Sequence, residues 1–193
     1  MKMNAPFHWL SAGALALLAA CGAPTNPEND KMMADHKAMM AADSSAKAMM
    51  NTNKEAMKKV FTMFETGSTD GIETCVADNM MEHTPSPDVT STGMQGLKDV
   101  IAMHHAAFPD TKITILSMVA EGDMVMAHFN MKGTNTGPMG KMPATNKAMD
   151  VNGVDVVRFE NGKGVEHWGY WEEGKWMQQM GMMPPPEEAA KKK

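Results

Sequence analysis

The sequence has few cysteines and almost no arginine. Its 193 residues include 2 cysteines, too few for a disulfide-rich scaffold or for a zinc site built on thiolates. The 18 basic residues, of which only Arg158 is an arginine, are outnumbered by 23 acidic residues and form no extended basic cluster. Because nucleic-acid binding needs clustered cations to neutralise phosphates, we expect no nucleic-acid partner.

The rest of the composition is that of a folded protein with one unusual component. Hydrophobic residues make up 43% of the chain and charged residues 21%, values that disfavour a wholly disordered chain. The length allows one ordinary domain plus appendages. Methionine is the exception, because it occurs 25 times, several times its usual frequency.

Residues 1–20 have the pattern of an export signal. Lys2 precedes an apolar run over 7–20, which is shorter than the roughly 20 residues of a membrane-spanning helix. The run ends in Leu-Ala-Ala-Cys21, which resembles the lipobox of bacterial lipoproteins. The resemblance implies cleavage before Cys21 and acylation of Cys21, and several acyl chains anchor a protein stably. An ordinary cleaved signal peptide is the alternative.

The predicted lipid anchor has consequences for location. We expect a protein of the bacterial cell envelope, attached to the membrane through Cys21 and facing the periplasm or the cell surface. Gly22 stands where an aspartate would signal retention in the inner membrane of other bacteria, so the outer membrane is favoured.

Residues 21–50 form a methionine-rich segment without large aliphatic or aromatic side chains. We interpret it as a flexible tether, helical in part, because it cannot nucleate a core of its own. The alternative is a non-enzymatic envelope lipoprotein that binds a ligand or copper through this segment, because thioethers select Cu(I) and His36 lies among them. Residues 184–193 are polar and proline-rich, and we expect a disordered tail there.

Residues 51–183 therefore remain for the folded domain, and helices precede strands in it. Apolar spacing and a capping box at Thr52 predict helices from Thr52 to Gly67, over 70–76 and over 94–107. Alternating patterns and turn residues predict two hairpins, with strands over 113–120, 124–131, 149–159 and 165–171. A half-turn or a strand is expected over 176–180. This order predicts an α+β fold: a cone-shaped, curved antiparallel sheet covered by about three N-terminal helices and enclosing a pocket.

Several short motifs resemble the SnoaL-like polyketide or ester cyclase family. They are Gly133-Thr-Asn-Thr-Gly137, Gly153-Val-Asp-Val-Val-Arg-Phe159, Asn161-Gly-Lys-Gly-Val-Glu-His-Trp168 and Gln178-Gln-Met-Gly181, in an order that covers about residues 53–183. The resemblance implies the nuclear transport factor 2-like cone with a central pocket, a sheet-to-sheet homodimer, and ring closure without a metal or an organic cofactor.

The resemblance also implies a catalytic aspartate on the last hairpin strand, and this chain departs from it. The family's run is His, then Trp or Arg, then Asp, whereas this sequence has His167-Trp168-Gly169. Glycine cannot exchange a proton, so cyclase activity itself is in question. Strand alternation places His167 and Asp155 on the pocket face, where they are our candidate catalytic pair. The alternative is a hydrogen-bonded pair that only rigidifies the sheet.

Five further residues are candidates for binding a small hydrophobic ligand. They are His83, His104, Phe108, Phe159 and Trp171. His83 lies where the family lines the mouth of its pocket, His104 lies on the apolar stripe of a helix, and Trp171 would stack on a flat ligand. We expect no metal site in the domain, because the histidines lack metal-ligand spacing. The prediction is thus a domain that binds a small hydrophobic molecule, with or without acid–base chemistry of the cyclase, isomerase or hydrolase type.

Overall fold

The computed structural model describes residues 26–183, so the predictions for residues 1–20, Cys21 and residues 184–193 lie outside the described residues. The elements in chain order are α1 Pro27–Thr66, the 3₁₀ turn η1 Ile72–Thr74, β1 Val76–Glu82, α2 Gly93–Ala107, β2 Lys112–Glu121, β3 Met124–Thr134, β4 Ala148–Glu160, β5 Lys163–Trp171 and α3 Glu173–Met180. The chain divides into two compact units, residues 1–41 and residues 42–193. In the first unit, the described residues form the start of α1. No helix within residues 26–183 is long and apolar enough to cross a membrane.

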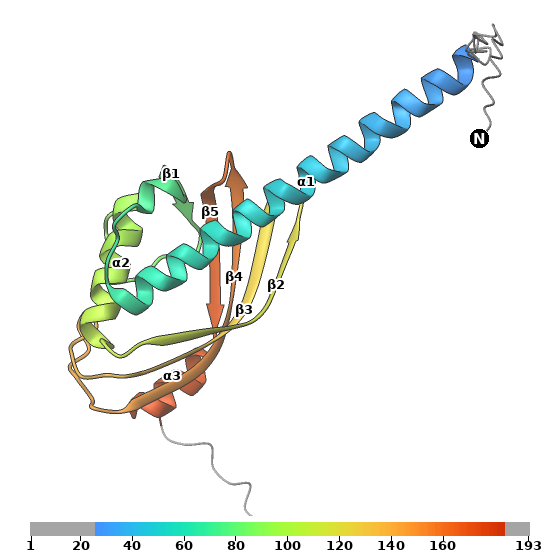
Figure 1. The fold of residues 1–193 in the computed structure, drawn as a ribbon. Coiled ribbons are helices and arrows are strands. Elements are labelled where there is room, and N and C mark those ends of the chain that lie inside the picture. Colours follow the sequence, from blue (N-terminus) through green and yellow to red (C-terminus); the bar gives the residue numbers. More distant parts are fainter. Residues whose placement is uncertain (1–25, 184–193) are drawn as a thin grey trace, which may run out of the picture. The chain divides into compact units, whose positions relative to one another are not determined.

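The second unit is built on one curved five-stranded sheet (Figure 1) with the strand order β1-β5-β4-β3-β2. Each strand from β2 to β5 pairs with the next one in the antiparallel direction, whereas β1 pairs with β5 in the parallel direction. The β4–β5 connection is Asn161-Gly162, and both residues have positive φ, 51° and 77°, as a tight hairpin turn requires. The pairing fixes which side chains of β4 and β5 point to the same face.

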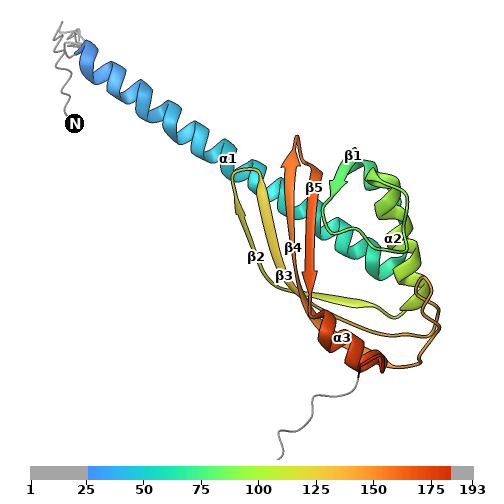
Figure 2. The same ribbon diagram turned by 180° about the vertical axis from the view of Figure 1, so that it is seen from behind.

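One face of the sheet is covered by the later part of α1 and by α2, as Figure 2 shows from behind. Val125, Ala127 and Phe129 of β3 are buried against this layer, in agreement with strand alternation. The rings of Phe61 in α1 and Phe129 lie 5.1 Å apart. Gly153 is paired with Phe129, and a Cβ atom at position 153 would lie 2.5 Å from the phenyl ring, so glycine is needed there.

The α+β class and the curved sheet predicted from the sequence are confirmed, and both predicted hairpins are present. The four predicted strands, β2 to β5, pair in the antiparallel direction as expected, but β1 was not predicted and adds a parallel edge strand. The short helix predicted over 70–76 is present only as the 3₁₀ turn η1 Ile72–Thr74, and β1 already begins at Val76. Of the three predicted N-terminal helices, α1 and α2 are present, and the third helix is α3, which follows the sheet.

The first helix also begins earlier than predicted. α1 is continuous from Pro27, so residues 27–50 are helical throughout. Thr52 is therefore not an N-cap: its hydroxyl donates to the carbonyl oxygen of Ala48 at 3.1 Å, one turn earlier in the helix. The capping-box pattern at Thr52 and Glu55 was a misleading signal, because the residues before it are good helix formers, including many Ala, Met and Lys.

Candidate functional site

A cavity of about 1340 Å³ lies between the curved sheet and the helices of the second unit. Its walls come from α1, β1, α2, β3, β4, β5, α3 and the loops between them. Most of the lining is apolar, and it includes nine methionines: Met57, Met80, Met81, Met103, Met131, Met139, Met142, Met177 and Met182. Methionine side chains are flexible, so such a wall adapts to the shape of a bound molecule.

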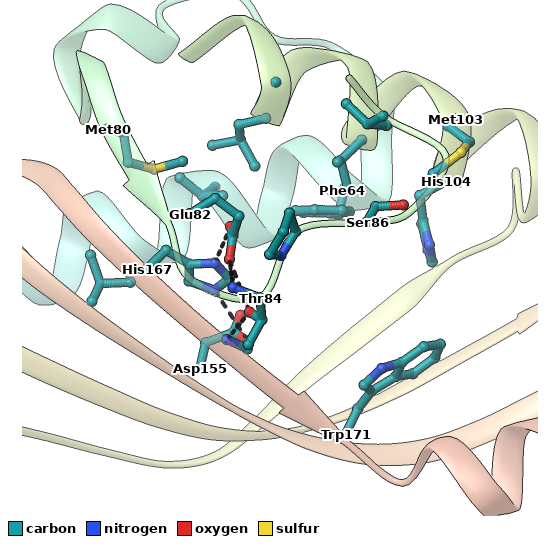
Figure 3. Close-up of a pocket in the computed structure, with 18 of the residues that line it drawn as sticks. Phe64, Met80, Glu82, Thr84, Ser86, Met103, His104, Asp155, His167 and Trp171 are labelled. Atoms are coloured by element: carbon teal, nitrogen blue, oxygen red, sulfur yellow. Dashed lines mark hydrogen bonds and ion pairs between the residues drawn. The ribbon is translucent and has the colours of Figure 1, made fainter. Parts of the chain in front are cut away.

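Three charged side chains meet on the sheet side of this cavity (Figure 3). The Oε2 atom of Glu82 lies 2.6 Å from Nδ1 of His167. The other ring nitrogen of His167, Nε2, lies 3.5 Å from Oδ1 of Asp155. The imidazole is thus flanked by two carboxylates, one in close hydrogen-bond contact and one at a longer distance.

Strand pairing explains why these three residues meet. Glu82 is the last residue of β1 and lies opposite His167 in the parallel β1–β5 ladder. Asp155 of β4 lies opposite Gly169, two residues after His167 on β5 and on the same face. A Cβ atom at position 169 would lie 3.2 Å from Oδ1 of Asp155 and 3.1 Å from Cε1 of His167. Because Gly169 has no side chain, the side chains of Asp155 and His167 can occupy the space above it.

Thr84 holds the carboxylate of Glu82 in place. Its backbone N–H and its hydroxyl both donate to Oε1 of Glu82, at 2.8 and 2.9 Å. The same hydroxyl oxygen accepts a hydrogen bond from the backbone N–H of Gly169 at 2.8 Å. One oxygen of Glu82 is thus bound by Thr84 and the other by His167, and the loop after β1 is attached to β5.

The two carboxylates decide the charge of His167. Burial alone lowers the pKa of a histidine, but the hydrogen bonds and negative charges of Asp155 and Glu82 outweigh it and raise the pKa of His167 to about 10. Burial would raise the pKa of Glu82, yet the contacts with His167 and Thr84 hold it below its ordinary value of 4.5. At neutral pH the site therefore contains an imidazolium ion paired with a carboxylate.

His104 is the second histidine of the cavity wall, and its state is the opposite. Burial, followed by the charge of neighbouring His105, lowers the pKa of His104 to about 4, so the ring is neutral at pH 7. Its Nε2 lies 3.0 Å from the hydroxyl of Thr111, which itself donates to the carbonyl oxygen of Phe108. That hydroxyl oxygen can therefore accept a hydrogen bond from Nε2–H, which favours the tautomer with the proton on Nε2.

Five of the seven residues predicted for the pocket line the cavity, namely Asp155, His167, His104, Phe159 and Trp171. His83 and Phe108 are not among the lining residues. The ring of His83 stacks on Trp168 with centroids 4.3 Å apart and contacts Glu166 at 2.8 Å. Trp168 and Glu166 alternate with His167 along β5, so His83 lies on the opposite face of the sheet.

Phe108 packs in the core beneath the pocket instead of lining it. It is completely buried at the end of α2, in a cluster with Met149, Val151 and Met180. A phenylalanine that follows an apolar helical stripe and precedes Pro109 is equally compatible with both positions. The sequence pattern could not separate a core residue from a pocket residue at this place.

Glu82 and Thr84 belong to the site although the sequence pattern does not single them out. The reason is that β1 has weak strand propensity: after Val76 it contains no β-branched or aromatic residue. A signal was present in its even positions, since Val76, Met80 and Glu82 share one face if the segment is extended. That reading would have placed Glu82, and not its neighbour His83, on the pocket side.

The cluster does not have the form of a metal centre. Within residues 26–183, no group of three or more His, Cys, Asp or Glu side chains is arranged to hold a metal ion. In the Glu82–His167 pair the imidazole is protonated, and a metal ligand needs a free ring nitrogen. The arrangement is suited to moving a proton and to stabilising charge on a bound molecule.

Comparison with known proteins supports the fold. The family model of the SnoaL-like polyketide cyclases matches residues 54–180. TsrD from Streptomyces laurentii is 22% identical, with a TM-score of 0.63 over 69% of this chain and 97% of TsrD. AclR from Streptomyces galilaeus is 23% identical, with a TM-score of 0.59 over 70% of this chain and 85% of AclR. At such low sequence identities, both structures are evidence for the fold alone. A search of curated proteins gives no significant match.

The ion pair predicts how stability depends on pH. The pKa of His167 is raised above 6.5 in the folded state, so its stabilising effect is complete below pH 6.5 and is lost as the pH rises to about 10. The wild type should therefore lose free energy of unfolding between pH 6.5 and pH 10, and in Glu82→Gln this loss should be smaller by on the order of 2 kcal/mol. Part of the loss remains in the variant, because Asp155 is still a partner of His167. Urea denaturation at the two pH values measures the difference.

The matched control is Glu121→Gln, which removes an exposed carboxylate from the last residue of β2. Its stability should follow the wild-type pH dependence. An E82Q variant that loses as much stability as the wild type over this pH range would show that Glu82 does not hold His167 in its charged form.

Proposed function

The chain belongs to the SnoaL-like polyketide cyclase family, and from this premise we propose that it performs acid–base chemistry on a small, largely apolar molecule in its cavity. The observation that carries the proposal is the cluster of Glu82, His167 and Asp155 in the wall of an apolar cavity. Charged groups are costly to bury, and such clusters in a cavity are typical of catalytic sites.

In the proposed reaction, Asp155 is the general base and His167 stabilises the charge that develops. Asp155 removes a proton from the carbon next to a carbonyl group of the substrate. The C–H electron pair forms a carbon–carbon double bond, and the π electrons of the carbonyl group move to its oxygen. The Nε2–H of His167 then donates to that oxygen as it becomes an enolate. Nε2 of His167 lies 3.5 Å from Asp155, which is long for a hydrogen bond, so the Nε2–H group is available to donate to a ligand.

Glu82 acts through His167 and does not touch the substrate in this scheme. Its contact at 2.6 Å keeps the imidazole oriented and protonated, and Thr84 fixes the carboxylate from behind. The proton that Asp155 takes is returned to carbon, or to oxygen after a new carbon–carbon bond has formed. The former outcome is an isomerisation and the latter is a ring closure by aldol addition.

The position of Asp155 supports its role in place of the family's aspartate. The family resemblance puts the catalytic aspartate at position 169, where this chain has glycine. Asp155 lies directly opposite Gly169 in the β4–β5 ladder, so its carboxylate is in the same layer of the sheet on the neighbouring strand. An aspartate added at position 169 would crowd the existing pair, as the short Cβ distances indicate.

The charge of the cavity indicates the class of substrate. Among the described residues that line the cavity there is no lysine or arginine, whereas there are five carboxylates, from Asp78, Glu82, Asp88, Asp155 and Glu173. A substrate with a free carboxylate or phosphate would be repelled, so a neutral or cationic molecule is favoured. Trp171 and Trp176, with ring centroids 5.2 Å apart, offer an aromatic wall for a flat ring system.

A binding protein without catalysis is the second candidate. It is favoured by the glycine at position 169, because in that case the ion pair only stiffens the sheet beneath a hydrophobic ligand. The two candidates agree on the ligand class and differ in whether Asp155 exchanges a proton with it.

Proton exchange separates the two candidates without knowledge of the natural substrate. The test incubates the full chain in D₂O with neutral aromatic β-keto esters and follows loss of the α-proton by NMR. We expect the wild type to accelerate exchange, and Asp155→Asn to reduce the acceleration by about 10²–10⁴-fold, as for loss of a general base. Asp78→Asn, which also removes a carboxylate of the cavity wall, is the control and should keep most of the activity. No acceleration by the wild type, or an equally active D155N variant, would refute the catalytic role.

We also propose that two copies associate through the outer face of the sheet. A row of apolar residues crosses this face, because Val119 pairs with Met126, Met126 with Val156, and Val156 with Trp168. Val119, Met126 and nearby Tyr170 are exposed in the single chain. An exposed apolar strip of this length is typical of a protein–protein contact.

A charge in the middle of this strip should separate the copies. Met126→Lys is expected to raise the dimer dissociation constant at least about tenfold, since a central apolar contact contributes more than about 1.4 kcal/mol. Met49→Lys, at another exposed methionine outside the sheet, should leave association unchanged. Analytical ultracentrifugation measures both, and a wild type that is monomeric at every concentration would contradict the proposal.

For the location, we propose that Cys21 carries the lipid anchor in the bacterial cell envelope, with the outer membrane favoured. The support is the Leu-Ala-Ala-Cys21 sequence after an apolar run. In a bacterial host fed with labelled palmitate, the wild type should be labelled and sediment with membranes, whereas Cys21→Ser should be unlabelled. Cys75→Ser controls for labelling of a cysteine as such, and a labelled C21S protein would exclude this anchor.

A further inference from the structure

α1 carries one histidine near its start, and this residue has an unusual set of neighbours. Methionine occupies all four positions that lie three and four residues before and after His36. These are Met32, Met33, Met39 and Met40, and α1 is helical throughout this region. The whole group lies in the unit that ends at Ala41.

Helix geometry brings these five side chains to one face. Residues three and four apart are neighbours on a helix surface, with Cβ atoms about 5–6 Å apart, so His36 has a methionine pair one turn below it and another one turn above. The residues between them, Ala34, Asp35, Lys37 and Ala38, lie at other angles around the helix. The sequence therefore concentrates four thioethers around a single imidazole.

The four methionines are free of packing within the described residues. Their exposed fractions are 62, 66, 64 and 59% for Met32, Met33, Met39 and Met40. Buried methionines of the second unit, such as Met57 and Met80, fill its core, but these four fill nothing in the described chain. Exposed apolar side chains in such a group call for a binding partner.

The chemistry of the group identifies that partner. Thioether sulfur is a soft donor and selects Cu(I) and similar ions, and a neutral imidazole suits the same metals. Thioethers carry no proton, so four of the five donors bind without releasing one. Hard ions such as Mg²⁺ and Ca²⁺ prefer oxygen ligands and are not expected here.

We propose that α1 carries a binding site for one monovalent soft metal ion, Cu(I) or its redox-inert analogue Ag(I), formed by Met32, Met33, His36, Met39 and Met40. The imidazole supplies the central ligand, and methionines from the turns below and above complete the coordination. Methionine has three rotatable bonds, which allows the sulfur atoms to close on the ion. This site is separate from the cavity chemistry and does not depend on it.

A second methionine pair in the same helix provides an internal comparison. Lys47-Ala-Met-Met50 repeats the pattern of Lys37-Ala-Met-Met40. Met49 and Met50 have no histidine three or four residues away, and their neighbours at those positions are Ser45, Ala46, Lys47, Thr52, Asn53 and Lys54. If methionine richness alone attracts the ion, both pairs respond, and if His36 organises the site, only the first does.

The experiment measures Cu(I) affinity of the full chain by competition with a coloured Cu(I) chelator under anaerobic, reducing conditions. One ion should bind per chain. The quadruple Met32→Leu, Met33→Leu, Met39→Leu and Met40→Leu variant should lose this binding, and His36→Ala should weaken it at least about tenfold, since even an indirect partner of a metal ligand contributes that much. Met49→Leu with Met50→Leu is the matched control and should bind as the wild type does.

Leucine is chosen because it keeps the helix and its apolar face while removing the sulfur. A role of this face in docking to another protein would survive the quadruple change, whereas metal binding would not. Titration with Ag(I), followed through the labelled methyl groups of methionine by NMR, localises the ion independently. The proposal requires shifts at Met32, Met33, Met39 and Met40. It is overturned if the quadruple variant or H36A binds Cu(I) as tightly as the wild type, or if Ag(I) shifts other methionines instead.

Discussion

The ion pair between His167 and Glu82 is the interaction on which the cavity depends. Two charged groups in the wall of an apolar cavity lose hydration, and removal of one partner from such a pair typically costs about 3–5 kcal/mol. The pair therefore ties the edge strand β1 to β5 at the point where both border the cavity. Thr84 extends this tie into the following loop through its bonds to Glu82 and Gly169. The pair of Glu82 and His167 thus determines the charge of the site and also holds together the two strands that form this part of the cavity wall.

The two faces of β5 have different tasks. The inner face presents His167 and the open space at Gly169 to the cavity. On the outer face, Glu166 accepts from Arg158 at 2.6 Å and contacts His83, whose ring covers Trp168. Arg158, the single arginine of the chain, is thus engaged in ion pairs on the outer face and does not contribute its charge to the cavity. The cavity is left with carboxylates and one imidazolium, a balance that favours neutral or cationic ligands.

The sequence predicted the elements whose patterns are local. The hairpins β2–β3 and β4–β5 have alternating apolar residues and clear turns, and the alternation also placed Asp155 and His167 on one face. β1 could not be predicted in this way, because its residues have weak strand propensity and its partner strand lies about 85 positions later in the chain. The consequence was a displacement by one residue: His83 was assigned to the pocket and its neighbour Glu82 was overlooked. In a strand, one position is the difference between the two faces.

At neutral pH, His167 is an imidazolium ion held by two carboxylates. Nitrogen NMR of the labelled full chain tests this state directly, because protonated and unprotonated ring nitrogens have distinct chemical shifts. The account predicts protons on both nitrogens of His167 at pH 7, with loss of one only near pH 10, while His104 is neutral at pH 7 and serves as an internal reference. An unprotonated nitrogen in His167 at pH 7 would contradict the account.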